Sequence, residues 1–484
     1  MDVLAHFPTV TTVLHVLIVV VVAARVINRR PAPGVGLAWL FLTALLPFVG
    51  AGVYFLIGER RISPQRARRL RTSSVELYDA AVHKDLTTVD WARHPPAAES
   101  MDLLGRKIGG SLTVSGCSLE MFSETEKILR AIARDIDAAE TSVLMEFYIW
   151  NSGGAADEVL EAVIRAAKRG VSCRVLVDAL GARPWWQSKQ PKRLRKAGVA
   201  LTAALPVGLL RTVVGRTDLR LHRKVVILDG RVAWTGSMNM VDPRFFKQGK
   251  GFGQWIDAMV RLEGAVVAPL AATMLGDWVA ETNEPVHDLV TSIGLAHIEP
   301  KGGADVQVVA SGPGESGEAL LQMLLALVNA ARRSLVLTTP YLVPDDSMLR
   351  ALRAAAGRGV AVSIIIPEKV DSFLTRYASR SYYDDLLDIG IEIYHYRGGL
   401  LHTKSIMVDE TMSMFGTVNL DMRSLWLNYE VALFVYDPAF ATELHRLQKS
   451  YIGDSELISA ERWAQRSFPE RYLENTLRLA SPLL

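Results

Sequence analysis

Two short runs of this 484-residue chain share one order of residue types that suits chemistry on a phosphate ester. The first run comprises His222, Lys224, Asp229, Ser237 and Asn239, and the second repeats the spacing with His402, Lys404, Asp409, Thr417 and Asn419. Imidazole can act as nucleophile, acid or base near neutrality, while ammonium, hydroxyl and carboxamide groups can bind anionic oxygens. Because the whole pattern occurs twice, we interpret both runs as parts of a site for phosphoryl transfer.

Each run is predicted to form a β-hairpin. His222 and Lys224 stand two apart in an apolar run, so in a strand both side chains leave the same face. Asp229-Gly230 between two apolar segments indicates a two-residue turn, which would pair Leu228 with Arg231.

Counting back from such a turn pairs His222 with Ser237, and the same count places His402 opposite Thr417. Each hairpin would then present imidazole, ammonium, hydroxyl and carboxamide on one face. The aspartates of the motif fall in the turns, off that face. We therefore assign Asp229 and Asp409 a structural part in the catalytic motif.

Strand and helix signals alternate through the rest of the chain. In the first half, Ser142–Ile149 and Ser172–Val177 are predicted strands around a helix at Ala156–Arg169; in the second, Ser334–Thr339 and Ala361–Ile366 flank a helix at Ser347–Arg358. A glycine follows each helix, Gly170 in the first half and Gly359 in the second. This duplication predicts two tandem α/β lobes, residues 103–290 and 300–484, joined by an aperiodic linker within Thr282–Asp305.

The N-terminus is predicted to be a two-span membrane anchor in residues 1–60. Phe7–Ala24 and Val35–Gly58 are uncharged apolar segments, each long enough to cross a bilayer as a helix. Six arginines between residues 60 and 71 follow the second segment, against three in the connector, which favours a hairpin with both ends cytoplasmic. The first segment alone would argue the reverse orientation, because no base precedes it. Residues 61–102 form a predicted basic juxtamembrane linker.

The charge distribution argues against a nucleic-acid partner. Nine arginines stand against two acids through residue 71, so the remaining chain carries 45 bases and 49 acids. An enzyme of nucleic acids usually holds excess positive charge on its catalytic body, whereas here it lies next to the membrane segments, where anionic headgroups are found. The two cysteines form no disulfide framework, and no cluster has metal-ligand spacing, so we expect neither a metal nor another cofactor.

The paired motifs resemble those of the phospholipase D superfamily, and further phrases resemble bacterial cardiolipin synthases over nearly the whole chain. Besides the N-terminal hydrophobic hairpin, these phrases are Leu46–Gly50, Glu146–Trp150, Leu176–Gly181, Ser311–Pro313, Thr339–Pro344 and Ser481–Leu484. Thr417 replaces the commoner serine but keeps the hydroxyl. The resemblance implies a bilobal fold with one active site at a pseudo-twofold interface, to which both hairpins contribute.

The resemblance also implies a mechanism. One histidine attacks the phosphodiester of phosphatidylglycerol, and the other protonates the leaving glycerol and then deprotonates a second phosphatidylglycerol, which gives cardiolipin. Similar enzymes most often use the N-terminal histidine as nucleophile, which favours His222 attacking and His402 as acid and base. The near-identical hairpins do not settle that order. The implied phosphate-binding groups are Lys224, Lys404, Asn239 and Asn419 with the hydroxyls of Ser237 and Thr417, and the implied imidazole-orienting acids are Asp257 and Glu430.

Several alternatives stay open at this stage. Water as acceptor would make the protein a phospholipase D that produces phosphatidic acid, and phosphatidylethanolamine can replace one phosphatidylglycerol. Trp185 and Trp186, followed by five bases, fit either a solvated helix face or a contact with the membrane interface, and Leu205–Gly215 can likewise dip into the bilayer. Small residues at Gly50–Gly52 are compatible with a homo-oligomer. We expect a bacterial inner-membrane protein with a cytoplasmic catalytic body.

Overall fold

The structure of the protein is a computed structural model, which describes residues 7–31, 33–58, 66, 68–70, 72–73, 76–77, 88–206, 218–247, 249, 251–293, 299–313, 318–479 and 481. The chain divides into two compact units, Met1–Ser63 with Val207–Leu219, and Pro64–Pro206 with Arg220–Leu484. Most of the predicted membrane-dipping segment at 205–215, the C-terminal phrase at 482–484 and the arginines at 60, 61 and 71 lie outside the described residues.

The first unit begins with one long apolar helix. Within α1 (Phe7–Arg29), the stretch Val10–Arg29 is long and apolar enough to cross a membrane. The second predicted span is not one continuous helix, because α2 (Pro33–Leu45) ends before Leu46 and α3 (Pro47–Val53) starts at a proline, followed by a π-helical turn at 54–58. A residue that precedes proline is disfavoured in the helical region, and Leu46 has φ −132°.

The second unit is built on one 15-stranded sheet. Its strand order from edge to edge is β19 (Ser455–Leu457), β13 (Glu392–Tyr396), β12 (Ala361–Pro367), β10 (Ser334–Thr338), β15 (Ser405–Val408), β16 (Met412–Gly416), β18 (Glu430–Tyr436), β9 (Ala304–Ser311), β1 (Thr113–Phe122), β8 (Met259–Glu263), β6 (Val232–Gly236), β5 (Val225–Leu228), β2 (Ser142–Phe147), β3 (Ser172–Asp178) and β4 (Ala200–Ala204). Apart from β19, the two halves repeat the same order outward from the antiparallel β1–β9 pair. We call strands β1–β8 with their helices the first lobe, and strands β9–β19 with theirs the second lobe.

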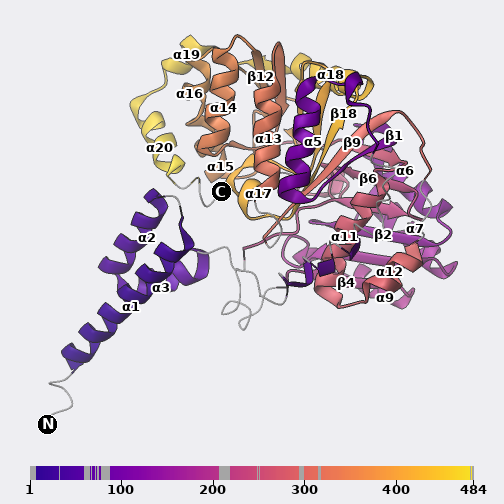
Figure 1. Ribbon diagram of the computed structural model, residues 1–484, viewed down its shortest axis with the longest axis horizontal. Helices are drawn as coiled ribbons and strands as arrows, with labels where there is room; N and C mark the ends of the chain where they lie inside the picture. The colour runs from indigo at the N-terminus through magenta and orange to yellow at the C-terminus, as the bar shows by residue number, and fades with distance from the viewer. Residues whose placement is uncertain are drawn as a thin grey trace. The chain divides into compact units, whose positions relative to one another are not determined.

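Helices cover this sheet. The first lobe carries α6 (Thr125–Ala138), α7 (Ala155–Lys168), α8 (Arg183–Trp186), α9 (Gln190–Lys196), α11 (Val267–Thr282) and α12 (Val286–Ile293). The second carries α13 (Ala319–Ala330), α14 (Asp346–Gly357), α15 (Phe373–Arg380), α16 (Tyr383–Leu387), α17 (Met422–Trp426), α18 (Pro438–Gly453), α19 (Ala460–Ala464) and α20 (Phe468–Arg478). Figure 1 shows α5 (Pro96–Gly109), α13 and α14 side by side over the second-lobe strands, and α13 contacts both neighbours.

The predicted duplication of two α/β lobes is confirmed. The order β2, α7, β3 recurs as β10, α14, β12, with bounds within two residues of those predicted. Gly170 (φ 92°) and Gly359 (φ 87°) follow the two helices in the left-handed conformation that glycine adopts without strain. In each lobe the strands on either side of this helix pair in parallel, which requires a crossover connection such as the helix provides.

The segments predicted to be linkers are partly helical. Residues 96–102, which we assigned to the basic linker, open α5, whose Ala98 and Met101 are buried in the core of the second lobe. The aperiodic linker contains α12, whose Leu289 and Ile293 are buried. That helix spans only eight residues, so its apolar positions complete too few turns to produce a clear periodic signal.

The predicted membrane contact of Trp185 is wrong. Its side chain is only 2% exposed, it stacks on Trp150 with ring centroids 5.0 Å apart, and its indole N–H donates to Gln190 at 2.7 Å. Trp186 is half-buried, and its N–H donates to the carbonyl of Asp178 at 3.1 Å. The aromatic pair therefore belongs to the packing of the first lobe, which the sequence could not distinguish from an exposed interfacial pair.

Replacing Trp185 with serine should destabilise the protein by about 3 kcal/mol or more, because a buried indole leaves a large cavity and an unpaired Gln190. Trp186→Ser is the matched control and should cost less, since that ring is half-buried. The measurement is urea unfolding of both variants in detergent. Equal midpoints for Trp185→Ser and the parent would contradict the buried assignment.

Candidate active site

The two histidine segments are held by backbone hydrogen bonds from the opposite lobe. Leu221 forms a parallel bridge with Tyr429, and the N–H of His222 donates to the Tyr429 carbonyl at 2.9 Å. In the second copy, β14 (Leu400–Leu401) pairs in parallel with β7 (Trp255–Ile256), and the N–H of His402 donates to the carbonyl of Ile256 at 2.8 Å. Each histidine thus lies beside the segment of the other lobe that carries an acidic residue.

The predicted hairpin register is wrong by one residue. Leu228 pairs with Val232, because the connection has three residues, of which Asp229 (φ 52°) and Gly230 (φ 63°) are left-handed. In the second hairpin Val408 pairs with Met412 in the same way.

The paired strands of the two hairpins begin only at Val225 and Ser405. The predicted pairs of His222 with Ser237 and of His402 with Thr417 therefore do not form. The histidines lie beyond the hairpin ladders, which frees them to dock on the other lobe.

Two histidine–carboxylate pairs cross the interface between the lobes. Nδ1 of His222 lies 2.9 Å from a carboxylate oxygen of Glu430, and Nδ1 of His402 lies 2.7 Å from Oδ1 of Asp257. All four side chains are buried. The resemblance implied both acids but not this exchange, in which the acid of each lobe holds the histidine of the other. An N–H at Nδ1 bonded to the carboxylate leaves the lone pair on Nε2.

The two motif hydroxyls complete the surroundings of these acids. Ser237 Oγ donates to Asp257 at 2.6 Å, and Thr417 Oγ1 donates to Glu430 at 2.5 Å. We expected these hydroxyls to bind substrate, but the buried carboxylates are stronger acceptors and hold them. Ser237 and Thr417 therefore fix the acids in place.

The motif carboxamides Asn239 and Asn419 are buried near the same segments. Asn239 Oδ1 accepts the N–H of Ile149 at 3.1 Å, and Asn419 Nδ2 donates to Asp421 at 3.0 Å. Both amides are thus fixed by the ends of neighbouring segments rather than left free to rotate.

Two fully buried lysines complete the site. Nζ of Lys224 donates to the carbonyl of His222, and Nζ of Lys404 donates to the carbonyl of His402, both at 2.5 Å. Burial lowers the pKa of Lys224 to about 8 and that of Lys404 to about 7, although Glu430 and Asp257 act in the opposite direction. Both lysines therefore titrate within reach of physiological pH.

Burial also keeps both imidazoles neutral. It lowers the pKa of His222 and of His402 to about 4, against the opposing effect of the carboxylates. For Glu430 and Asp257, burial acts to raise the pKa, but the histidine and lysine beside each acid outweigh it and lower the pKa overall. The site thus holds ionised carboxylates next to neutral imidazoles whose Nε2 atoms can act as nucleophile or base.

The aspartate of each motif has a structural position. The Asp229 carboxylate accepts the N–H groups of Glu140, Thr141 and Ser142 at 2.8–2.9 Å. Asp409 accepts those of the three residues that lead into β10, at the same distances. Each aspartate therefore joins its hairpin turn to the start of the neighbouring central strand.

Sequence reasoning assigned no role to three further residues at the site. The Asp178 carboxylate accepts the N–H of Leu221 at 2.9 Å and thereby positions the residue before His222. The Tyr148 ring meets His222 edge-on with centroids 5.2 Å apart, and the Trp255 ring stacks on His402 at 4.4 Å. Asp178 and Tyr148 belong to the phrases that carried the family resemblance, so the signal was present without a role attached to it.

The guanidinium groups of two arginines, Arg66 and Arg223, lie over the ring of Tyr429. Arg223, between the motif histidine and lysine, is buried in an ion pair with Asp277 and donates to the carbonyl of Glu430 at 3.0 Å. Arg66 forms an ion pair with Glu281, and its guanidinium lies 5.4 Å from the Tyr429 ring centre. The basic segment as a whole was expected next to the membrane, but the charge of Arg66 is paired inside the protein. In the described part of the chain, no three His, Cys, Asp or Glu side chains gather as a metal site would require.

Removing the Asp229 carboxylate should cost about 1–3 kcal/mol of stability, because three backbone N–H groups lose their acceptor. Asp229→Ala can be compared with Asp388→Ala, which alters an exposed aspartate and should change stability little. Thermal unfolding of the two variants in detergent tests the difference. Indistinguishable unfolding temperatures would refute the structural role.

Comparisons with known proteins agree with this geometry. The family described as cardiolipin synthase, phospholipase D-like domain, matches residues 132–249 and 324–451, and a phospholipase D-nuclease N-terminal family matches residues 17–59. Cardiolipin synthase A of Erwinia tasmaniensis is 43% identical over 97% of this chain and 96% of its own, and that of Edwardsiella ictaluri is 42% identical over the same shares.

Among solved structures, the phosphatidylserine synthase of Haemophilus influenzae Rd KW20 has the same fold, with a TM-score of 0.58 at 15% identity. It covers 81% of this chain and 100% of its own. Paired histidine–lysine segments that share one site, together with identity above 40% over nearly the full length of curated relatives, place this chain in the cardiolipin synthase family of the phospholipase D superfamily.

Proposed function

We propose that the protein is a cardiolipin synthase, which transfers a phosphatidyl group from one phosphatidylglycerol to another and releases glycerol. The observation that carries this proposal is the pair of buried imidazoles, each held at Nδ1 by a carboxylate from the opposite lobe. Such a pair supplies a nucleophile and a proton carrier at one centre, and the relatives named cardiolipin synthase share nearly the whole chain.

In the first step, Nε2 of His222 attacks the phosphorus of phosphatidylglycerol. The phosphorus–nitrogen bond forms as the bond to the glycerol oxygen breaks, and His402 gives its Nε2 proton to that oxygen. Lys224 and Lys404, with the amides of Asn239 and Asn419, neutralise and orient the non-bridging oxygens. The phosphodiester anion favours an imidazolium beside it, so substrate binding itself supplies the proton-loaded form of His402.

In the second step, neutral His402 takes the proton from a hydroxyl of a second phosphatidylglycerol. That oxygen attacks phosphorus, the bond to His222 breaks, and cardiolipin is released with both histidines restored. The assignment of His222 as nucleophile follows the usual order in similar enzymes. The other site residues act indirectly, Asp257 and Glu430 by orienting the imidazoles and Asp229 and Asp409 by fixing the hairpins.

We further propose a bacterial inner-membrane location with residues 1–60 as a two-span anchor and a cytoplasmic body. The apolar stretch in α1 and the match to an N-terminal family at 17–59 support the anchor. The break at Pro47 gives the second segment the form of two shorter helices, which is compatible with a bent passage. The proposed partners are phospholipids and the bilayer, and not nucleic acid. The proposed domains keep the bounds predicted above, and the first unit is proposed to mediate a homo-oligomer.

Product analysis tests the reaction directly. In phosphatidylglycerol vesicles without added metal, the parent protein should form cardiolipin and glycerol in equal amounts. His222→Ala and His402→Ala should each lower the rate by about a hundredfold or more, since each loses one participant in bond making or proton transfer. Phosphatidic acid as the main product of the parent would instead mean that water is the acceptor.

The pH dependence of kcat should show a wide bell, because in the enzyme–substrate complex the bound phosphodiester keeps His402 protonated. Neutral imidazole is needed to attack, so burial that lowers the histidine pKa to about 4 moves the acid limb well below neutrality. Charged lysine is needed to bind phosphate, so the fall on the alkaline side should begin near the lysine pKa values of about 7 and about 8. The measurement uses a short-chain phosphatidylglycerol in detergent.

Lys404→Arg is the control for that alkaline limb. Guanidinium stays charged across this pH range. The alkaline limb should therefore move to higher pH, toward the Lys224 pKa of about 8, even if the maximal rate falls. An alkaline limb that stays in place in both Lys404→Arg and Lys224→Arg would show that the lysines do not set it.

A further inference from the structure

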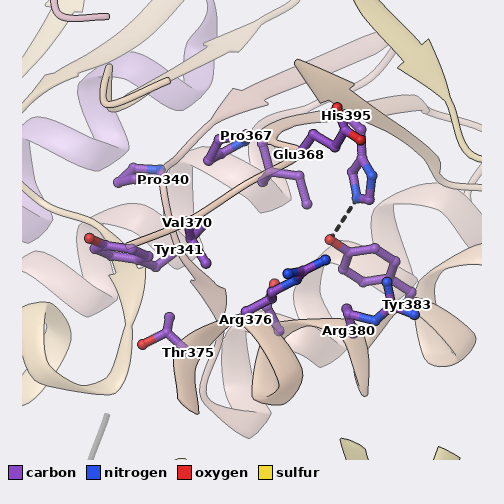
Figure 2. A pocket seen from close by; sticks show the side chains of 12 residues that line it. Pro340, Tyr341, Pro367, Glu368, Val370, Thr375, Arg376, Arg380, Tyr383 and His395 are labelled. Atoms are coloured by element: carbon purple, nitrogen blue, oxygen red, sulfur yellow. Dashed lines mark hydrogen bonds between the residues drawn. The ribbon is translucent and has the colours of Figure 1, made fainter. Parts of the chain in front are cut away.

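A polar pocket lies in the second lobe, at the ends of β10, β12 and β13, outside the histidine pair. The pocket is small and opens to solvent. Tyr341, Glu368, Arg376, Arg380 and His395 are among the residues that line it. Figure 2 shows the Arg376 side chain extending toward the middle of this space, with Glu368 above it and Tyr383 beyond it.

Among the residues that the structure describes here, the pocket offers one arginine without an ion pair, whose guanidinium lies 5.9 Å from the Tyr377 ring centre, and several fixed polar groups. Arg376 is exposed, and no carboxylate in the described part of the chain forms an ion pair with it. Arg380, one turn later on α15, is fixed by Glu474 at 2.6 Å. Across the space, Nε2 of His395 meets the hydroxyl of Tyr383 at 3.0 Å, and the Glu368 carboxylate is exposed. Guanidinium groups suit phosphate, whereas a carboxylate suits hydroxyl donors.

An exposed apolar strip adjoins this polar pocket. The helix that supplies both arginines begins with Phe373 (63% exposed) and Leu374 (45% exposed). It packs against α20, which exposes Phe468 (71%) and Tyr472 (65%). We call these four residues the apolar strip. A phosphate-binding pocket beside exposed apolar side chains matches the two ends of a phospholipid.

The pocket also adjoins the active site through Tyr341. The hydroxyl of Tyr341 donates to Asp371 at 2.6 Å, and Asp371 pairs with Lys247 at 2.9 Å. Nζ of Lys247 lies 5.5 Å from the ring centre of Trp255, and Trp255 stacks on His402. A continuous series of contacts therefore connects the pocket wall with the acid–base histidine.

We propose that this pocket binds the headgroup of a second phosphatidylglycerol while the first occupies the histidine pair. In this waiting position its phosphate contacts Arg376, its glycerol hydroxyls donate to Glu368 until the headgroup moves on to His402, and its acyl chains lie against the apolar strip. The inference rests on the proposed function, because a transfer between two phosphatidylglycerols needs both lipids at one enzyme. The two buried lysines are occupied by the phosphate of the donor lipid, so the second phosphate requires cations of its own.

Binding to the full-length protein in detergent tests this site. His222→Ala stops turnover, and calorimetric titration with dihexanoylphosphatidylglycerol should then show two binding events per chain. Adding Arg376→Gln should weaken one event by about tenfold or more, the loss expected for a charge-assisted contact. Arg353→Gln, an exposed arginine on α14, is the matched control and should leave both events unchanged.

Two further arms identify the ligand. Glu368→Gln should weaken binding of the glycerol headgroup but strengthen binding of inorganic phosphate, because it removes a hydroxyl acceptor and a negative charge together. Dihexanoylphosphatidylcholine carries the same chains without glycerol hydroxyls and should compete poorly. Unchanged binding in Arg376→Gln would overturn the proposal, and so would inorganic phosphate that binds the parent pocket as tightly as the lipid. Because turnover is absent, these results do not depend on whether the parent protein forms cardiolipin.

Discussion

The crossed histidine–carboxylate pairs are the constraint on which the rest of the structure depends. A carboxylate such as Glu430 is costly to bury unless its charge and its lone pairs are satisfied, and here the partners come from two lobes: His222 from one and Thr417 from the other. Neither lobe can complete this arrangement alone. The continuous sheet across the β1–β9 pair serves to hold the two lobes in a fixed register, so that the imidazole of each meets the acid of the other. The same contacts between the lobes therefore close the interface and assemble the active site.

The site combines this symmetry with differences that suit two distinct chemical roles. β3 and β12 occupy equivalent places in the two halves of the sheet, but β3 ends in Asp178, which accepts the N–H of Leu221, whereas β12 ends in Pro367. The segment before His222 thus gains a carboxylate anchor that the segment before His402 lacks. His402 instead stacks on an aromatic ring. A histidine that becomes covalently bonded to phosphorus benefits from a rigid backbone, while one that carries protons benefits from a position tuned by its surroundings. The asymmetry is consistent with the assignment of His222 as nucleophile.

The sequence pattern predicted the parts of the fold that depend on local interactions. It failed for the features whose position depends on tertiary contacts. The alternation of strands and helices and the capping glycine Gly170 followed from residue type and spacing, whereas both carboxylates of the site came from the family resemblance. The hairpin register did not, because Asp229 itself adopts the left-handed conformation that lengthens the turn, which Asp-Gly alone does not specify. The membrane contact of Trp185 failed because an aromatic side chain looks the same in a sequence whether it faces lipid or packs inside a lobe, and the burial of the Arg66 charge was not predictable for the same reason. The exchange of acids between lobes likewise needs the three-dimensional arrangement.

The burial of Arg66 concerns the part of the second unit that directly follows the first unit in sequence. Glu281 pairs with Arg66, which follows the first unit in sequence, and it also accepts the N–H of Leu205 at 2.9 Å, two residues before the chain re-enters that unit. One carboxylate at the end of α11 therefore binds residues near two of the three points at which the chain passes from one unit to the other. The same arginine lies over Tyr429, whose carbonyl binds the backbone of His222. Arg66 and Glu281 therefore connect the segment that follows the first unit in sequence with Tyr429, the neighbour of the acid that pairs with His222.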